Sequence, residues 1–385
     1  MTGTAGTAAD GVRTSGGSPT APVRLFLSGD VMLGRGIDQV LPCPGEAALR
    51  EAFVDDASDY VRLAERVNGP VPSPVEFTWP WGEALPALEA AAPDVRVVNL
   101  ETSVTRQEAF APGKGVHYRM SPANLPALTA ASPDVCVLAN NHVLDFGAPG
   151  LEETLDALDS VGLATAGAGR SRAAAQRPAA VPLTAGGRVL VYSVGSGCSG
   201  IPPHWAATNR RPGVERIAAP SRRAAEHLAK RTEADRRDGD VVVVSVHFGS
   251  NWGYDVAPEQ REFAHQLIDG GVDLVHGHSS HHPRPIEVYR ERLILYGCGD
   301  LINDYEGIAG HEGYRSDLRA LFLVDIEPAT GSLVGLRVAV LQARRLRLQW
   351  PPRQDAEWLC RVLDERSRLG GSQLGLDSDG AVVLR

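Results

Sequence analysis

The chain has 385 residues, of which 43% are hydrophobic and 22% charged, a composition typical of globular proteins. With 38 Lys and Arg against 47 Asp and Glu, its net charge of −9 argues against nucleic acid as the main partner. Five cysteines without a C-x-x-C pair exclude a disulfide framework and favour a reducing, cytoplasmic location.

The first 20 residues are rich in Gly, Ser, Thr and Ala and lack the basic and apolar regions of a signal peptide. We therefore expect residues 1–20 to form a disordered N-terminal arm. No segment approaches the roughly 18 consecutive apolar residues that a membrane-spanning helix needs. The sequence predicts no membrane insertion, and it carries no signal for an oligomeric state.

Short apolar runs rich in β-branched residues recur along the chain and predict buried strands. They cover residues 23–28, 95–100, 135–139, 189–194, 241–246, 272–276 and 293–296. Apolar residues at helical spacing or helix-forming composition predict helices at 149–161, 221–236, 257–269 and 355–369. Because strands and helices alternate, we expect an α/β fold.

Two later apolar runs, 320–326 and 333–341, flank a turn sequence at Pro328–Gly331 and predict a hairpin. We expect one α/β domain over residues 21–345. A helical tail over residues 346–385 is expected to pack on this domain as a small C-terminal appendage.

Polar residues follow the ends of most of the predicted strands. The candidates are Asp30, Glu101, Asn141, His142, Asp145, His247, His278, His281, His282 and Asp300. In open α/β sheets, ligands bind outside the carboxyl ends of the strands. We therefore expect these side chains to converge on one crevice.

Carboxylate, amide and imidazole groups together suit Mn, Fe, Zn or Ni better than Ca or Mg. Glu101 is the best candidate for a carboxylate that bridges two ions. Taken alone, a His at a strand end is more often a hydrogen-bonded surface residue, and an Asp after Gly is often a turn or helix cap. The recurrence of such residues after separate strands favours a shared metal site.

The sequence gives little or no support for other catalytic or cofactor-binding motifs. Gly195–Gly200 matches G-x-G-x-x-G, but the following Pro202 and Pro203 cannot open the helix that a dinucleotide site requires. The chain has neither a P-loop nor a G-x-S-x-G nucleophile elbow. Cys298 lies between two glycines, where a buried, incidental thiol is favoured over a nucleophile.

Five motifs, in this order, resemble the CapA family of poly-γ-glutamate capsule synthesis. They are GDVMLGR at 29–35, NLE at 99–101, NNH at 140–142, HFG at 247–249 and GHSSHHP at 277–283. The resemblance spans roughly residues 23–304. That family is similar to the calcineurin-like metallophosphoesterases, which implies a four-layer α/β sandwich with a two-metal site at the strand ends.

Carried over by position, the resemblance implies six metal ligands: Asp30, Glu101, Asn141, His247, His278 and His281. Glu101 stands where the phosphoesterases place a bridging Asp. His142 would be the general acid or transition-state stabiliser, and Asp145 would orient it. The implied cofactors are one or two divalent ions, with Mn, Zn or Fe as the candidates.

One position departs from the phosphoesterase pattern. Those enzymes have Asp-x-His after the first strand, whereas this chain has Met32 in place of the His. A thioether is a poor ligand for a hard ion. One metal site is therefore expected to be weaker, or to be completed by Asp300 or by water.

Three functions are compatible with these residues. In the first, a metal-activated water attacks a phosphoester or an amide of a peptide or polyglutamate, and Arg35 or Arg119 counters the charge of an anionic substrate. In the second, a peptide epimerase, a metal acidifies the Cα–H while His281 or His282 and Asp300 exchange the proton. The third is a non-catalytic scaffold of polymer synthesis. The substrate is accordingly a small molecule, a peptide or an anionic polymer.

Overall fold

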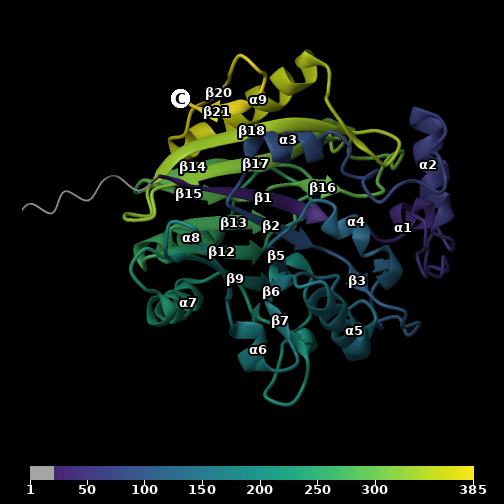
Figure 1. The fold of residues 1–385 in the computed structure, drawn as a ribbon, viewed down its shortest axis with the longest axis horizontal. Coiled ribbons are helices and arrows are strands. Elements are labelled where there is room, and N and C mark those ends of the chain that lie inside the picture. The colour runs from purple at the N-terminus through teal and green to yellow at the C-terminus, as the bar shows by residue number, and fades with distance from the viewer. Residues whose placement is uncertain (1–20) are drawn as a thin grey trace, which may run out of the picture.

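The computed structural model describes residues 21–385 as two large sheets packed face to face, with helices on both outer sides (Figure 1). This helix–sheet–sheet–helix order confirms the predicted four-layer α/β sandwich. The predicted disordered arm, residues 1–20, lies outside the described residues. Over the described part of the chain, no helix is long and apolar enough to cross a membrane.

The first sheet has ten strands and is mixed, with β1 parallel to β2 and antiparallel to β17. Its order is β20 (Leu374–Leu376), β21 (Val382–Leu384), β18 (Leu333–Ala343), β17 (Leu318–Ile326), β1 (Val23–Val31), β2 (Val95–Leu100), β5 (Val135–Val137) and β6 (Ala164–Ala166). In addition, β16 (Asp300–Ile302) pairs with β1, and β19 (Leu348–Gln349) pairs with β18. The antiparallel β17–β18 pair is the predicted hairpin.

The second sheet has seven strands, of which β9, β12, β13 and β15 are parallel neighbours. Its order is β11 (Arg216–Ile217), β9 (Arg188–Ser196), β12 (Val241–His247), β13 (Leu274–His278), β15 (Arg292–Leu295) and β14 (Ile286–Tyr289), with β8 (Ala179–Pro182) on β9. Because these strands are parallel, their carboxyl ends lie at one edge of the sheet.

Two small strand pairs and nine α-helices, together with five short 3₁₀ helices, complete the described chain. The small pairs are β3 (Ser103–Val104) with β4 (Arg119–Met120), and β7 (Ala168–Gly169) with β10 (Gly213–Val214). The helices are α1 (Gly36–Val40), α2 (Ser58–Asn68), α3 (Ala84–Ala91), α4 (Pro126–Thr129), α5 (Gly147–Ser160), α6 (Arg172–Gln176), α7 (Arg222–Asp235), α8 (Pro258–Asp269) and α9 (Arg353–Ser367). The four predicted helices correspond to α5, α7, α8 and α9.

Alternation along the strands determines which layer each side chain joins. On β1, Leu25 and Leu27 lie in the core between the sheets, whereas Phe26 lies in the core beneath the helices of the first sheet. On the outer face of the second sheet, Phe263 of α8 packs in a cluster with Val244 of β12. The strands are therefore buried on both faces, which explains their continuous apolar runs.

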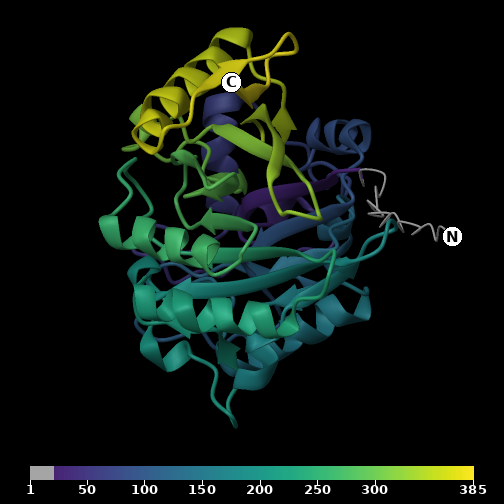
Figure 2. The same cartoon turned by 90° about the vertical axis from the view of Figure 1, so that its left-hand side faces the viewer.

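The C-terminal segment closes one end of the sandwich, at the top of Figure 2. Leu359 and Leu363 of α9 join the core between the sheets. Just beyond α9, the Ser372 hydroxyl accepts a hydrogen bond of 3.1 Å from the backbone N–H of Val288 on the edge strand β14. Residues 346–385 also contribute β19, β20 and β21 to the first sheet. The description as a helical tail is therefore incomplete, because the edge of β18 offers backbone groups with which these strands pair.

Candidate metal centre

Strand register places the candidate ligands at one edge of the sandwich. His247 and His278 end the neighbouring strands β12 and β13 and are paired with each other. Asp30, near the end of β1, is paired with Asn99 of β2 on one side and with Asp300 of β16 on the other. Five strands from two sheets therefore bring these side chains to one region.

The approach of β16 to β1 depends on a glycine. A Cβ atom at Gly29 would lie 1.6 Å from the carbonyl oxygen of Gly299, so only glycine leaves room for the two backbones. The N–H of Asp30 then donates a 2.9 Å hydrogen bond to that same oxygen. The Gly-Asp sequence at 29–30 thus brings the carboxyl groups of Asp30 and Asp300 together.

Two groups of three ligands emerge, and Asp30 belongs to both. In each group the ligand atoms lie within 4.8 Å of one another, and every residue is buried. The first group is Asp30, His247 and His278, and the second is Asp30, His281 and Asp300. Asp30, and not Glu101, is the carboxylate common to the two groups.

Glu101 lies to one side of this arrangement. Its Oε1 atom is 3.9 Å from Nε2 of His247 and 3.8 Å from Nε2 of His142. It is therefore placed to join the first group, but it belongs to neither set of three. Met32 is fully buried and is absent from both groups, whereas Asp300 supplies a carboxylate to the second.

The two imidazoles of the first ligand group, those of His247 and His278, are neutral. Nδ1 of His247 and Nδ1 of His278 are 2.7 Å apart, so only one of them can carry a proton. Nε2 of His247 is 2.8 Å from the amide oxygen of Asn141. Burial lowers the pKa of both histidines well below the usual value. The neutral form that results is the form that binds metals.

The second ligand group has a different electrostatic character. Nδ1 of His281 lies 2.9 Å from a carboxylate oxygen of Asp300. Burial opposes a charge on His281, but the Asp300 carboxylate outweighs it and raises the pKa of that imidazole. The other Asp300 oxygen accepts a 2.5 Å hydrogen bond from Asn303, which in turn accepts one of 2.6 Å from Arg319.

Asn99 holds the carboxylates of the centre in place, a role that the sequence analysis missed. Its side-chain NH₂ donates to Asp30 at 2.7 Å and to Glu101 at 3.1 Å. Its amide oxygen accepts from the side chain of Asn140 at 3.1 Å. Residues 99 and 101 share one face at the end of β2, and this period-two spacing in the NLE motif was the available signal.

His142 lies beside the ligand groups in a chain of hydrogen bonds. Its Nδ1 is 2.7 Å from Asp145, as the resemblance implied, and Lys114 contacts the other oxygen of Asp145 at 2.5 Å. Burial, reinforced by the Lys114 cation, lowers the pKa of His142 to about 4. Lys114 was not among the predicted residues, although it is one of two lysines in a chain that otherwise uses arginine.

His282 is turned away from both ligand groups. Its Nδ1 lies 3.1 Å from the carbonyl oxygen of Pro283, and its ring stacks 4.6 Å from Tyr314 and 6.0 Å from Trp252. Burial lowers its pKa to about 4. The ring of His281 also contacts Trp252, with 5.4 Å between centroids, but its Nδ1 faces Asp300.

The two arginines expected to meet an anionic substrate are already engaged. The Arg35 guanidinium is buried, binds both oxygens of Asp304 at 2.5 and 3.1 Å, and pairs with Glu51 at 2.9 Å. Arg119 is also buried and donates to the backbone carbonyls of Gln107 and Glu46. The expectation of a substrate-binding role for them is therefore wrong, because acidic groups and carbonyls nearby satisfy both.

The buried carboxylates of the centre would be stabilised by a bound cation. Burial and the neighbouring Asp300 raise the pKa of Asp30 to about 7, and burial with Asp30 raises that of Glu101 well above its usual value. The Oδ2 atom of Asp30 is buried and has no hydrogen-bond partner among residues 21–385. Buried carboxylates with too few protein cations, beside neutral imidazoles, fit one or two divalent transition-metal ions.

Comparison with known proteins places the chain among capsule synthesis proteins. Residues 24–305 match the family model described as Bacterial capsule synthesis protein PGA_cap. A probable polyglutamine synthesis accessory protein of Mycobacterium tuberculosis is 54% identical over 350 residues, covering 91% of this chain and 92% of the relative. The PGA biosynthesis protein CapA of Bacillus subtilis is 30% identical over 215 residues, covering 55% and 54% of the two chains. Among solved structures, a 5'-nucleotidase precursor from Thermus thermophilus matches with a TM-score of 0.47 and 13% identity, covering 89% of this chain and 58% of that one.

Proposed function

Because the chain belongs to the family of bacterial capsule synthesis proteins PGA_cap, we propose that it is a divalent-metal-dependent hydrolase that assists the synthesis of an acidic polymer. The observation that carries this proposal is the position of Asp30 in two buried groups of metal ligands. The target bond is a phosphoester or an amide of a peptide or polyglutamate substrate. The names of the relatives, which concern polyglutamine synthesis and PGA biosynthesis, support a polymeric substrate.

Divalent ions held here would neutralise charge that develops on a phosphoryl or carbonyl oxygen and would acidify a water molecule. Asp30, His247 and His278 would hold one ion, and His281 and Asp300 would share Asp30 to hold the other. Asn99 keeps Asp30 and Glu101 oriented by donating to both.

His142 supplies the proton transfer in this proposal. It is neutral, since its pKa is about 4, and its Nδ1–H donates to Asp145. This tautomer leaves Nε2 free to accept a proton from the attacking water and to return it to the leaving group. Asp145 fixes the ring and favours the protonated imidazole, whereas the Lys114 cation opposes it, so that the proton is readily passed to the leaving group.

The two alternatives differ in what they predict. The epimerase gains no support from the relatives, which are named as capsule or polyglutamine synthesis proteins, and His282 packs among aromatic rings. A scaffold would need no metal. Hydrolysis adds the mass of a water to the substrate, whereas an epimerase takes up solvent deuterium without a change in covalent formula.

Metal content and activity, measured together, test the proposal. We expect one or two Mn, Zn or Fe ions per chain in the purified or reconstituted protein, and their loss in Asp30→Asn/His281→Ala. Hydrolysis of bis(p-nitrophenyl) phosphate or of poly-L-glutamate should stop on chelation and return with Mn²⁺. His204→Ala, at an exposed histidine, is the control and should keep its metal. Activity that survives chelation, or a protein that binds no metal after reconstitution, would refute the proposal.

A further inference from the structure

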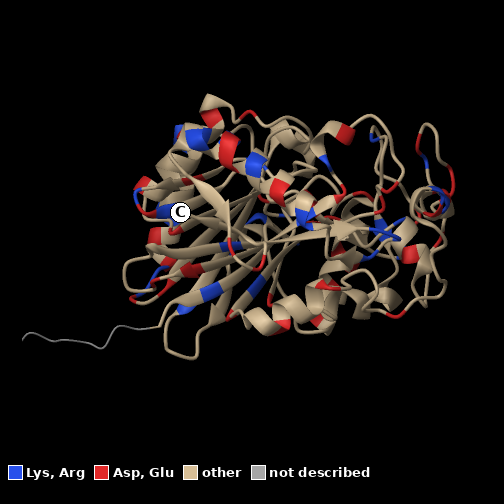
Figure 3. Cartoon of the chain, turned by 90° about the horizontal axis from the view of Figure 1, so that it is seen from above, with Lys and Arg blue, Asp and Glu red and all other residues tan. Residues whose placement is uncertain are grey.

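Positive charge is concentrated in one part of this acidic chain. Residues 170–232 contain eleven Arg or Lys residues and two acidic residues, Glu215 and Glu226, whereas the whole chain has a net charge of −9. This stretch forms α6, strands β8 to β11, most of α7 and the loops between them. Seen from above, by contrast, basic and acidic residues are interspersed over that side of the molecule (Figure 3).

Much of this charge lines a groove between α6 and α7. Two adjoining hollows of about 670 Å³ and about 1020 Å³ share Gln176 and Arg231, so they form one continuous depression, named here the α6–α7 groove. One end lies at Ser221 and Arg223, at the start of α7, and the other at Arg237, beyond its end.

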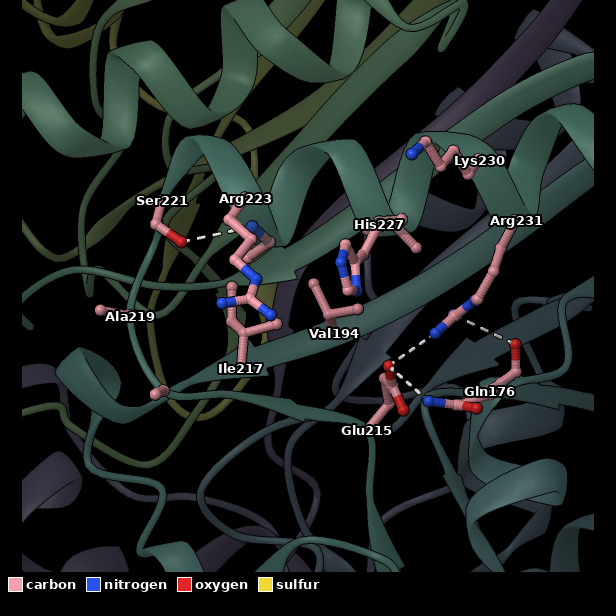
Figure 4. Close-up of a pocket in the computed structure, with 13 residues that line it drawn as sticks. Gln176, Val194, Glu215, Ile217, Ala219, Ser221, Arg223, His227, Lys230 and Arg231 are labelled. Carbon is pink, nitrogen blue, oxygen red and sulfur yellow. Dashed lines mark hydrogen bonds and ion pairs between the residues drawn. The ribbon is translucent and has the colours of Figure 1, made fainter.

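Arg223, His227 and Arg231 recur every four residues and therefore lie on one face of α7, about 6 Å apart along its axis. In Figure 4, Arg223 and His227 point from α7 toward Ile217 and Val194, and Arg231 reaches Glu215. The Arg231–Glu215 pair is 2.7 Å long. The groove therefore has a row of basic groups above an apolar floor.

Several of these cations have no acidic partner. Within residues 21–385, no ion pair engages the side chains of Arg177, Arg223 or Arg237, and all three are exposed at the groove. Other arginines at the groove are paired, Arg231 with Glu215 and Arg236 with Asp273. A groove that keeps unpaired guanidinium groups in a chain rich in acids is suited to an external anion.

We propose that the α6–α7 groove binds an extended acidic polypeptide, whose carboxylates pair with the unpaired guanidinium groups of Arg177, Arg223 and Arg237. Guanidinium groups bind carboxylates through two parallel hydrogen bonds, and the apolar floor accommodates the methylene groups of glutamyl units. No Phe, Tyr or Trp lines the groove, so it lacks the stacking platforms of single-stranded nucleic-acid sites. Its concave shape also disfavours a flat lipid surface.

The groove is separate from the metal centre but reaches the same sheet edge. Strand β11, at the Arg223 end of the groove, pairs with Gly195 and Ser196 at the end of β9. Gly195 is also paired with His247, a ligand of the first metal group. An acidic chain held in the groove therefore leaves it at the edge of the second sheet that carries the metal ligands.

Binding of fluorescently labelled poly-L-glutamate to the full protein tests this site, with and without metal. Arg177→Gln/Arg223→Gln removes two unpaired groove cations, and Arg66→Gln/Arg361→Gln removes the same charge from exposed positions on α2 and α9. We expect the groove variant to weaken binding about 2- to 30-fold, and the control to change it less than about twofold. The affinity of the native protein should fall as salt rises.

Equal losses in the two double variants would overturn the proposal, because they would indicate attraction to overall charge alone. Tighter binding of oligothymidylate or of phosphatidylserine vesicles than of poly-L-glutamate at the same ionic strength would also overturn it. Failure here is distinguishable from failure of the hydrolase proposal, because binding is also measured on the metal-free protein and the metal content is measured separately.

Discussion

Asp30 and Asp300 occupy paired positions on the neighbouring parallel strands β1 and β16, and both are buried. Two neighbouring carboxylates in the protein interior disfavour each other's ionisation. Burial and the neighbouring Asp300 therefore raise the pKa of Asp30 to about 7. A bound cation would remove this penalty. The predictions below start from this pair.

The shared position of Asp30 predicts how many ions each variant loses. Asp30→Asn should lose both ions, because Asp30 belongs to both ligand groups, whereas His247→Ala and His281→Ala should each lose one. Metal per chain after reconstitution with Mn²⁺ or Zn²⁺ and gel filtration measures this. Identical stoichiometry in the three variants would contradict the assignment of Asp30 as the shared ligand.

In the metal-free protein, Asp30→Asn should be more stable than the native chain at pH 8. The pKa of Asp30 rises from its usual 3.8 to about 7 on folding, so its ionisation opposes folding as the pH rises through this window. The advantage of the variant should therefore be on the order of a few kcal/mol at pH 8 and disappear near pH 4. Thermal unfolding in EDTA across this pH range measures it, and with metal restored the order should reverse.

His142 should affect turnover and not metal binding. His142→Gln removes the proton-transferring Nε2, and we expect hydrolysis to fall about 10²- to 10⁴-fold. Metal content should stay at the native level, because His142 belongs to neither ligand group. A parallel loss of metal and activity would instead mean that His142 holds an ion.

Lys114 should lower the pKa of His142. Its Nζ lies 3.2 Å from Nδ1 of His142, so Lys114→Met removes a cation that lowers the pKa of that imidazole. We expect the pKa of His142 to rise, measured by NMR titration of the metal-free protein. Lys230→Met, at the other lysine of the chain, is the matched control and should leave the titration of His142 unchanged.

Arg35 should matter for stability. It lies 3.8 Å above the ring of Tyr60, and its removal would leave the buried Asp304 carboxylate without its cation. Arg35→Met should therefore cost about 3–5 kcal/mol of unfolding free energy in urea. Arg62→Met breaks the exposed pair with Asp59 and should cost less than about 1 kcal/mol.

The sequence alone was enough to predict the strands and the polar residues that gather at their ends. Runs such as 95–100 and 241–246 are apolar and β-branched over the length of a strand, a property that depends on neighbouring residues only. Because parallel strands end at one edge, the polar residues after those runs had to converge. Asp30, His247 and His278 were identified in this way.

Only the tertiary structure decided which of these residues lie together in each ligand group. Asp30 and Asp300 are 270 positions apart and meet because β16 inserts beside β1, which no local pattern reveals. Likewise, Lys114 reaches His142 from a distant loop, and the ring of His282 packs against Tyr314.

Packing also decided which charged side chains are paired within the protein and which remain unpaired. Arg35 and Arg223 are equivalent by residue type, yet Arg35 is buried against Asp304 and Arg223 remains unpaired at the α6–α7 groove. Local composition determines which elements form, because a strand or helix depends on residues close in sequence. The partner of a charged side chain depends instead on strand register and on contacts between segments far apart in the chain.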